Sequence, residues 1–232
     1  MSTSGSPFPR AGVAVDLVIL TLREHKLSVL LIQREDEPYS GAWALPGGFM
    51  SKREDLTEAA DRVLADEASL GDRAVHVEQV RTYGATDRDP RGRVVSVAFM
   101  ALGADLPEPR RGEGVADARW WAVEDLTEVT LAFDHPVLLA DAVERARAKL
   151  EYTTLAVTFL PEEFTISQLR GVYESVWGRP LDAGNFHRKA TRTEGFVVDL
   201  ETHAAPTGGR PARLYRAGDG TRLNPPLLRA GD

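Results

Sequence analysis

The chain has 232 residues, enough for one large or two modest hydrophobic cores, and we expect two. Its 43% hydrophobic and 27% charged residues predict a folded protein, and the absence of cysteine excludes disulfides, thiolate metal sites and cysteine nucleophiles. Residues 1–11 contain one charge and no apolar stretch, which predicts a disordered leader. No apolar run approaches the roughly 20 residues that span a bilayer, so we expect a soluble, cytoplasmic protein without a membrane partner.

The net charge of −7 is confined to the first part of the chain. Residues 1–150 contain 25 acidic and 18 basic residues, whereas residues 151–232 contain 10 of each. Within the second part, residues 165–229 hold 10 basic against 6 acidic residues. This local excess of positive charge is a mild form of the footprint that nucleic-acid-binding surfaces have.

The first part of the chain predicts a mixture of strands and helices. Runs of aliphatic and β-branched residues indicate strands at 13–20, 27–32, 75–83, 93–102 and 118–122. An amphipathic helix over 54–68 follows from an apolar stripe at helical spacing, made of Leu56, Ala59, Ala60, Val63 and Leu64. A second helix is expected from Asp134, as its capping residue, through Pro136 in the first turn to Lys149.

The second part of the chain predicts a helix-turn-helix. Residues 165–168, Thr-Ile-Ser-Gln, match a capping box, which opens a helix to Trp177. After a glycine-containing break at 178–181, Asp182 is expected to cap a further helix to about Arg192. Two helices joined by a tight turn are the core of a helix-turn-helix.

A hairpin is predicted beyond the two helices. Strand-like residues 196–200 and 213–216 flank a turn at 206–211 that is rich in proline and glycine, which indicates a wing. The segment 151–163 is the seam between the two parts of the chain. We therefore divide the chain into the leader 1–11, a first domain 12–152 and a second domain 153–232.

Residues 48–70 resemble the Nudix box, G-x5-E-x7-R-E-U-x-E-E-x-G-U, in which U is a bulky aliphatic residue. Six positions are on register, namely Gly48, Glu54, Arg62, Leu64, Glu67 and Leu70. In active Nudix hydrolases the helix glutamates hold divalent metal against a pyrophosphate, because carboxylates one turn apart offer hard oxygens to one cation cluster. The resemblance implies an ancestral phosphoanhydride site on the predicted helix over 54–68.

Three positions of the box depart from the family pattern. Val63 replaces the glutamate after the arginine, Asp66 replaces the first glutamate of the later pair, and Ser69 replaces the glycine. Because Val63 cannot coordinate a cation, we lean towards a protein that is not an enzyme. The vestigial residues are Glu54, Arg62, Asp66 and Glu67, with a weak Mg²⁺ site at Asp66 and Glu67 only if hydrolysis remains. Glu67 is explained equally well as a residual polar-site residue or as a satisfied structural carboxylate.

Candidate effector contacts cluster around the box and a charged loop. They are Arg34, Trp43, Gly47, Gly48, Phe49, Glu67, Arg91 and Arg93. Arginine offers phosphate oxygens a planar fork of donors, and Trp43 can stack on an adenine or fill the sheet surface instead. The turn at 46–48 suits close approach of a ligand, with a plain tight turn as the alternative. A solvated connection is the alternative for the loop 87–93.

Candidate DNA contacts lie on the last predicted helix. Asn185, Arg188, Lys189 and Arg192 share one face, while Ala183, Phe186 and Ala190 line another. Arginine and lysine pair with guanine edges or phosphates, and asparagine with adenine. The predicted DNA contacts are Asn185, His187, Arg188, Lys189, Arg192 and, at the hairpin tip, Arg210. The alternative is a solvated basic helix face without a DNA partner.

Read together, the two halves resemble the NrtR family of Nudix-related repressors of NAD metabolism, over roughly residues 12–228. The degenerate box, the loop 87–96 and the segments 164–169 and 185–189 carry this resemblance. It implies an α/β Nudix fold, with a mixed sheet between helices, as the effector-binding domain, followed by a C-terminal winged helix-turn-helix.

The resemblance also implies how the protein works. We expect a homodimer that represses NAD biosynthesis or salvage genes from double-stranded operator DNA and is relieved by ADP-ribose or a related nucleotide, with no required cofactor. One alternative is an ADP-ribose pyrophosphatase, alone or bifunctional, that uses Mg²⁺. Another is a noncatalytic module whose winged helix contacts protein.

Overall fold

The computed structural model describes residues 10–68, 75–109, 111–112, 114–204 and 211–229. A seven-stranded sheet forms from β1 (Gly12–Arg23), β2 (Lys26–Arg34), β3 (Trp43–Ala44), β4 (Gly47–Phe49), β5 (His76–Tyr83), β6 (Val94–Leu102) and β7 (Val115–Ala122). The strands β1 and β6 are parallel, and the other pairs are antiparallel, so the sheet is mixed. All five predicted strands of the first part are confirmed.

The strand β1 is the centre of the sheet and organises the site described below. One edge of β1 pairs with β6, and the other edge pairs with β4 over residues 14–16 and with β2 over residues 20–23. Its apolar run is continuous because both faces of the sheet are covered. Leu17 and Ile19 pack in the cluster of α1 (Leu56–Ala68), whereas Val18 and Leu20 pack in the cluster of α2 (His135–Tyr152).

Both predicted helices of the first part are present, with one correction at a helix start. The helix α2 begins at His135 and has a proline in its first turn, as predicted, but the Asp134 side chain makes no capping bond. The Asp134 carboxylate instead accepts two hydrogen bonds from the guanidinium of Arg88, at 3.0 and 2.7 Å. The expected cap is wrong because a buried arginine with two well-placed donors holds the carboxylate.

The second part contains a winged helix-turn-helix. Its elements are η2 (Thr154–Phe159), α3 (Ile166–Trp177), α4 (Ala183–Arg192), β8 (Val197–His203) and β9 (Arg213–Ala217). The short helix η1 (Val123–Glu128) belongs to the first part and follows β7. The Thr165 hydroxyl and Gln168 side chain form the predicted capping box, and Asp182 accepts from the Asn185 N–H at 2.7 Å. Gly178 ends α3 in the left-handed region, at a φ of 69°, where glycine is least strained.

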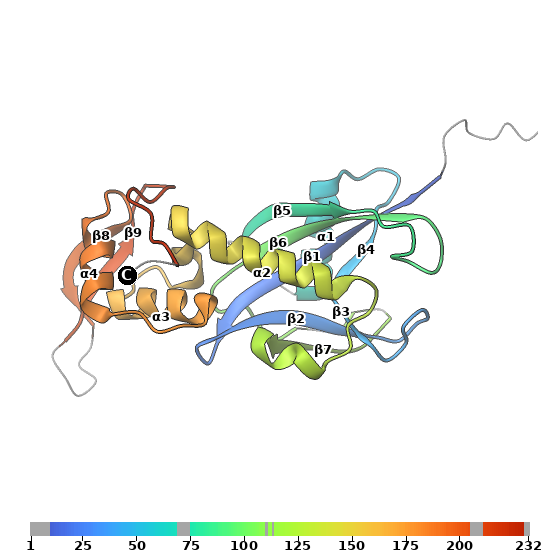
Figure 1. Cartoon of the computed structure of the whole chain (residues 1–232), viewed down its shortest axis with the longest axis horizontal. Coiled ribbons are helices and arrows are strands. Elements are labelled where there is room, and N and C mark those ends of the chain that lie inside the picture. The colour runs from blue at the N-terminus through green and yellow to red at the C-terminus, as the bar shows by residue number, and fades with distance from the viewer. Residues whose placement is uncertain (1–9, 69–74, 110, 113, 205–210, 230–232) are drawn as a thin grey trace, which may run out of the picture.

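The helix α2 connects the two ends of the elongated molecule (Figure 1). One hydrophobic cluster runs from the sheet residues beneath α2 into α3, α4 and β9, so the packing is not split into the two separate cores that we expected. The Trp177 indole donates to the Arg147 carbonyl at 3.2 Å, and the Arg147 guanidinium donates to the Val176 carbonyl at 2.9 Å. The limits 12–152 and 153–232 therefore remain a prediction about folding units. None of the helices in the described ranges is long and apolar enough to cross a membrane.

Candidate functional site

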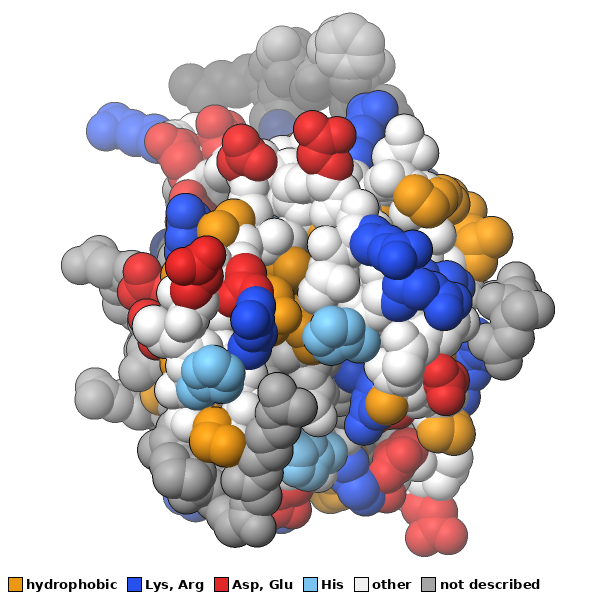
Figure 2. Space-filling view, turned by 90° about the vertical axis from the view of Figure 1, so that its left-hand side faces the viewer, with side chains coloured by type: hydrophobic (Ala, Val, Ile, Leu, Met, Phe, Trp, Pro, Cys, Tyr) orange, Lys and Arg blue, Asp and Glu red, His pale blue; other side chains and the backbone are white. Residues whose placement is uncertain are grey.

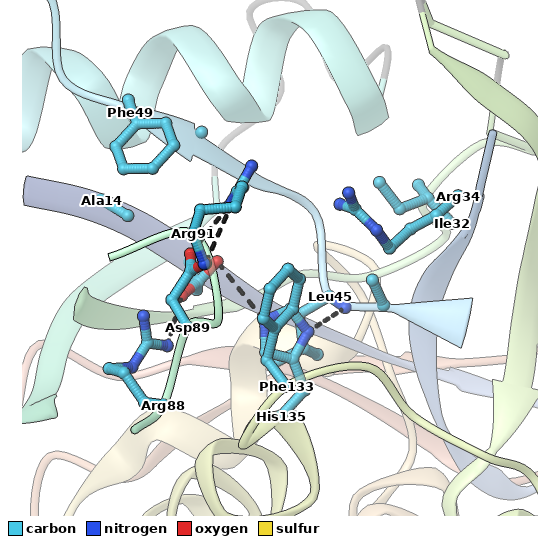
Figure 3. A pocket seen from close by; sticks show the side chains of 14 residues that line it. Ala14, Ile32, Arg34, Leu45, Phe49, Arg88, Asp89, Arg91, Phe133 and His135 are labelled. Carbon is cyan, nitrogen blue, oxygen red and sulfur yellow. Dashed lines mark hydrogen bonds and ion pairs between the residues drawn. The ribbon is translucent and has the colours of Figure 1, made fainter. Parts of the chain in front are cut away.

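A pocket of about 130 Å³ opens where β2 and β4 separate along the edge of β1 (Figure 3). Its walls come from the four strands β1 to β4, the loop after β5 and the start of α2. The lining residues are Ala14, Asp16, Ile32, Arg34, Ala44, Leu45, Gly47, Gly48, Phe49, Arg88, Asp89, Arg91, Phe133 and His135. Three arginines in so small a space, beside aromatic rings, favour an anionic ligand with a planar group.

Buried ion pairs form the floor of the pocket. The Arg88 side chain is only 4% exposed and lies between Asp134, which it binds through two hydrogen bonds, and Asp16, whose carboxylate is 3.6 Å away. The Ser96 hydroxyl donates to the same Asp16 carboxylate. A buried charge needs such partners because it has lost its water. Arg88 therefore fixes the floor, and its positive charge is already compensated.

His135 joins the floor to the first turn of α2. The Leu45 backbone N–H donates to His135 Nδ1 at 2.9 Å, which leaves the proton of the neutral ring on Nε2, 3.7 Å from Asp16 Oδ1. Burial lowers the pKa of His135, so the imidazole stays neutral at physiological pH. The first residue of α2 is thus held directly against the pocket.

Arginines and aromatic rings alternate at the mouth of the pocket. The Arg91 guanidinium carbon lies 5.1 Å from the Phe49 ring centroid and 5.5 Å from that of Phe133, and Arg34 lies 5.1 Å from the Phe133 centroid. Asp89 holds Arg91 with two hydrogen bonds of 3.0 and 2.7 Å, and these bonds lower the pKa of Asp89. Burial, and then the nearby charge of Arg91, lower the pKa of Arg34. A ligand anion between the two arginines would relieve this repulsion.

The two glycines of the loop serve different purposes. A Cβ at Gly47 would lie 2.3 Å from Asp16 Oδ1 and 2.8 Å from the Val15 carbonyl, so glycine is needed for β4 to approach β1. A Cβ at Gly48 would meet nothing closer than an Arg62 nitrogen at 3.8 Å. Close packing of β4 against β1 therefore explains the glycine at position 47 without a ligand, whereas Gly48 leaves room beside the pocket.

The Nudix-box residues form a structural pair rather than a metal cluster. Arg62 donates to both oxygens of Glu54, at 3.0 and 2.8 Å, and to the Phe49 carbonyl at 3.2 Å, which ties α1 to β4. The bond from Arg62 lowers the pKa of Glu54 to about 2. Val63 is 3% exposed within the α1 cluster, and Asp66 is exposed. No group of three metal-ligating side chains occurs among the described residues, which do not include the Glu67 side chain.

The structure brings five of the eight predicted effector contacts into one pocket, namely Arg34, Gly47, Gly48, Phe49 and Arg91. Two others do not line it. Trp43 packs edge-on against Trp121 at 5.2 Å with the Arg119 guanidinium over its ring, and so fills the sheet surface. Arg93 donates to the carbonyls of Gly84 and Ala85 at 2.7 and 3.0 Å, which closes its own loop. The eighth, Glu67, lies outside the described side chains.

Sequence reasoning missed much of the pocket lining, including its floor. Asp16, Arg88, Phe133 and His135 all line the pocket, and none was a candidate effector contact. Asp16 did carry a signal, since it is the one carboxylate within the apolar run 13–20. The loop 87–93 is also not the solvated connection considered above, because Arg88 and Asp89 are 7% and 5% exposed.

The predicted DNA-contacting side chains lie at the opposite end of the molecule. Arg188, Arg192 and His187 are exposed on α4, while Asn185 and Lys189 are half-buried. Phe186 and Ala190 are buried, as predicted, but Ala183 is exposed and does not join them because it is the first residue of the helix. Phe186 packs against Tyr173 of α3, with ring centroids 5.3 Å apart.

Figure 2 views this end of the molecule and shows Lys and Arg side chains gathered over one half of the face, with His side chains beside them. The Arg188 guanidinium donates to the Asn185 side chain at 2.7 Å, which orders two neighbouring groups on the exposed face of α4. Arg210 lies outside the described residues. The exposed guanidinium groups of Arg188 and Arg192 and the half-buried amide of Asn185 are groups that can pair with base edges and phosphates.

Comparison with known proteins matches both parts of the chain. Residues 10–142 match the NUDIX domain, and residues 156–217 match the NrtR DNA-binding winged helix domain. The ADPR responsive transcriptional repressor NtrR of Acinetobacter baylyi is 34% identical over 213 residues, which cover 91% of this chain and 84% of the repressor.

Two solved structures extend the comparison. The crystal structure of Shewanella oneidensis NrtR complexed with a 27mer DNA is 31% identical with a TM-score of 0.78, covering 93% of this chain and 99% of that one. The cocrystal structure of the NUDIX domain of Shewanella oneidensis NrtR with ADP ribose is 34% identical with a TM-score of 0.56, covering 62% of this chain and 94% of that one. The first match spans both parts of the chain, and the second is confined to a NUDIX domain.

The fold and the site define a class of protein in which a Nudix domain with a degenerate metal-binding helix is followed by a winged helix of the DNA-binding type. The chain belongs to the NrtR family. The predicted fold class, a mixed sheet between helices followed by a winged helix-turn-helix, is confirmed.

Proposed function

We propose that this protein is a transcriptional repressor that binds double-stranded operator DNA and releases it when ADP-ribose, or a related nucleotide of the NAD cycle, fills the Nudix pocket. The observation that carries the proposal is the joining of two sites by one helix. The helix α2 starts with His135 in the pocket wall and ends beside the winged helix. A ligand changes DNA affinity only if it binds the DNA-competent and incompetent states with different affinity, and α2 offers a physical connection through which the pocket and α4 can be coupled.

The chemistry of the pocket supports a nucleotide diphosphate as the effector. Arg34 and Arg91 line the pocket and supply donors and positive charge for a pyrophosphate, and an anion between them would reduce their mutual repulsion. Phe49, 46% exposed at the mouth, offers a ring face for a purine. The printed names of the relatives, an ADPR responsive repressor and a NUDIX domain complexed with ADP ribose, support the choice of ADP-ribose.

The chemistry of α4 supports DNA as the partner. Its N-terminus is exposed, Arg188 and Arg192 are exposed while Phe186 and Ala190 are buried, and the hairpin of β8 and β9 follows as a wing. An α-helix with Arg, Lys and Asn on its outer face fits the major groove of B-form DNA. The match to Shewanella oneidensis NrtR complexed with a 27mer DNA supports this assignment.

We assign no hydrolytic step to the pocket, because the described residues do not fit a catalytic metal. Val63 stands where a glutamate ligand is expected and is packed in the core, and Arg62 already occupies both oxygens of Glu54. The pyrophosphatase alternative therefore lacks a described ligand set. Release of AMP from ADP-ribose with Mg²⁺, abolished in Glu67→Gln, would overturn this assignment.

Two finer parts of the proposal go beyond the site itself. We infer from the family that the protein acts as a homodimer on genes of NAD biosynthesis or salvage. A winged helix that binds a two-fold symmetric operator needs two copies of the chain, since each copy reads one half-site. Light scattering with and without DNA would determine the number of chains in the complex.

The decisive experiment selects DNA with the protein itself. Duplexes enriched by the protein from a random library, and a scrambled duplex of the same composition, are titrated with and without ADP-ribose. We expect a selected sequence whose dissociation constant rises when ADP-ribose is present and is unchanged by ribose 5-phosphate. Failure to enrich any sequence would reject the DNA assignment, and an unchanged dissociation constant with ADP-ribose would reject the effector.

A further inference from the structure

The last described segment of the chain, residues 218–229, returns from the wing to α2, and we call it the C-terminal strap. It lies beyond residue 217, where the match to the winged helix domain ends. Its backbone is held along its length. The Leu223 N–H donates to the Tyr152 carbonyl at 2.9 Å, the Leu227 N–H donates to the Glu151 carbonyl at 2.8 Å, and the Thr154 hydroxyl donates to the Gly220 carbonyl at 2.7 Å.

An arginine fastens the end of the strap to α2. The Arg229 guanidinium donates to Glu151 Oε1 at 2.7 Å and to the two oxygens of Glu144 at 2.5 and 3.1 Å. Glu144 and Glu151 are two turns apart on α2, so one guanidinium spans both. The Glu151 side chain is only 12% exposed, which strengthens its part of the interaction relative to a fully solvated pair.

The middle of the strap lies against the recognition helix α4. Two hollows flank this contact: one is lined by Pro225, Pro226 and Leu227 together with Arg188, Lys189, Arg192 and Thr193. The other is lined by Leu227 and Leu228 together with Trp177, Arg179, Leu181, Asp182, Asn185, Phe186 and Lys189. Leu227 is 5% exposed and lines both hollows with Lys189. The helix α4 is therefore supported by the strap as well as by α3.

We propose that the C-terminal strap positions the recognition helix for sequence readout, and that Arg229 is the positioning residue that anchors the strap to α2. The inference rests on the proposed DNA-binding function and assigns to it a segment outside the matched domain. Sequence readout requires base contacts placed to within a fraction of an ångström, whereas phosphate contacts tolerate small shifts. Releasing the strap should therefore reduce discrimination between DNA sequences more than it reduces general DNA affinity.

The strap also gives α4 a second connection to the pocket. The helix α2 carries His135 of the pocket wall at its first residue and the two Arg229 partners further along. If a ligand displaced α2, Glu144 and Glu151 would move with the helix and would carry Arg229 and the strap along. Releasing Arg229 should then also reduce the factor by which ADP-ribose raises the dissociation constant for DNA.

The test compares Arg229→Ala with a matched control, Arg222→Ala. Arg222 is an exposed arginine of the same strap, and no ion pair within the described residues involves it. Both variants remove one positive charge from the same segment. Dissociation constants are measured for the duplex that the wild-type protein enriches and for its scrambled counterpart, at several salt concentrations.

For Arg229→Ala we expect the ratio of the two dissociation constants to fall about tenfold, with the scrambled duplex bound almost as before. For Arg222→Ala we expect the ratio to stay at the wild-type value. The affinity of each variant for ADP-ribose without DNA should be unchanged, which shows that the protein is folded. Equal loss of affinity for both duplexes in both variants would mean that Arg229 acts only by its charge, and would overturn the proposal.

Glu151→Gln provides a test with the opposite charge, should Arg229→Ala fold poorly. Removing a negative charge strengthens binding to DNA phosphates if charge alone matters. If the strap positions α4, Glu151→Gln lowers sequence discrimination, as Arg229→Ala does. The single variant Arg229→Lys should then retain more discrimination than Arg229→Ala. Wild-type sequence discrimination in Glu151→Gln would reject the positioning role of the C-terminal strap while leaving the proposed function intact. Failure of the wild-type protein to enrich any duplex would instead reject the function and this inference together.

Discussion

The pocket and the recognition helix both use arginine, but in opposite environments. The Arg88 side chain in the pocket floor is 4% exposed and is held between two carboxylates. Arg188 and Arg192 on α4 are exposed, and no carboxylate pairs with them in the part of the chain that the structure describes. A buried arginine must be neutralised and is thereby fixed in place, whereas a solvated arginine keeps its donors for an incoming phosphate or base.

This difference in environment separates ligand binding in the pocket from DNA binding by α4. The side chains of the pocket are already held in place, so ligand binding has a small entropic cost of ordering the protein. The basic α4 side chains Arg188 and Arg192 are exposed, and their long-range attraction for DNA depends on salt. Changes at the two sites should therefore have separate effects.

The largest effect is expected for Arg188→Ala combined with Lys189→Ala. Loss of two side chains from the outer face of α4 should weaken binding to the selected duplex by about 100-fold or more, since each good contact contributes roughly 1–3 kcal/mol. ADP-ribose affinity, measured by calorimetry without DNA, should match the wild-type value. Unchanged binding to the duplex would reject α4 as the recognition helix.

The next largest effect is expected for Arg91→Ala. Removing one guanidinium from the mouth of the pocket should weaken ADP-ribose binding about 10- to 100-fold, because a hydrogen bond to a charged group contributes roughly 1.5–3 kcal/mol. DNA binding without ligand should stay the same. Arg93→Ala is the matched control, since Arg93 binds carbonyls of its own loop and does not line the pocket. Equal losses in both variants would show that the pocket was misplaced.

Gly47→Ala should act on the fold that holds the pocket. The new methyl group would lie 2.3 Å from Asp16 Oδ1, so β4 must move away from β1, and we expect the free energy of unfolding to fall by about 1–3 kcal/mol. Gly48→Ala is the control, because its methyl group meets nothing within 3.8 Å. Urea denaturation of both variants checks this. Equal stability of the two would contradict the close approach of β4 to β1.

The smallest effect concerns pH and His135. Burial lowers its pKa in the folded state, so the stability associated with the neutral ring is complete above the unfolded pKa of about 6.5 and is lost as the pH falls below it. Between pH 7.5 and 5.5 we expect wild-type protein to lose about 1 kcal/mol more than His135→Gln. Chemical denaturation at both pH values measures the difference, and parallel behaviour of the two proteins would place His135 in solvent.

Interactions between residues close together in the sequence were predicted more accurately than interactions between distant residues. The capping box of Thr165 and Gln168 and the cap of Asp182 were predicted correctly because each joins residues three apart. The Asp134 cap was not, because Arg88, 46 residues away, takes its carboxylate. Trp43 was considered for both stacking and packing, and its place against Trp121 depends on the pairing of separate strands.

The amino-acid sequence by itself determined the order of strands and helices, the degenerate Nudix helix and the exposed face of α4. These features depend on neighbours within a turn or a strand, so periodicity and caps reveal them. Only the tertiary structure decided the pocket floor and the strap. Leu45 meets His135 across 90 residues and Arg229 meets Glu144 across 85, and such contacts follow from how the elements pack. Burial then fixes which charges are compensated, and so which are left for a ligand or DNA.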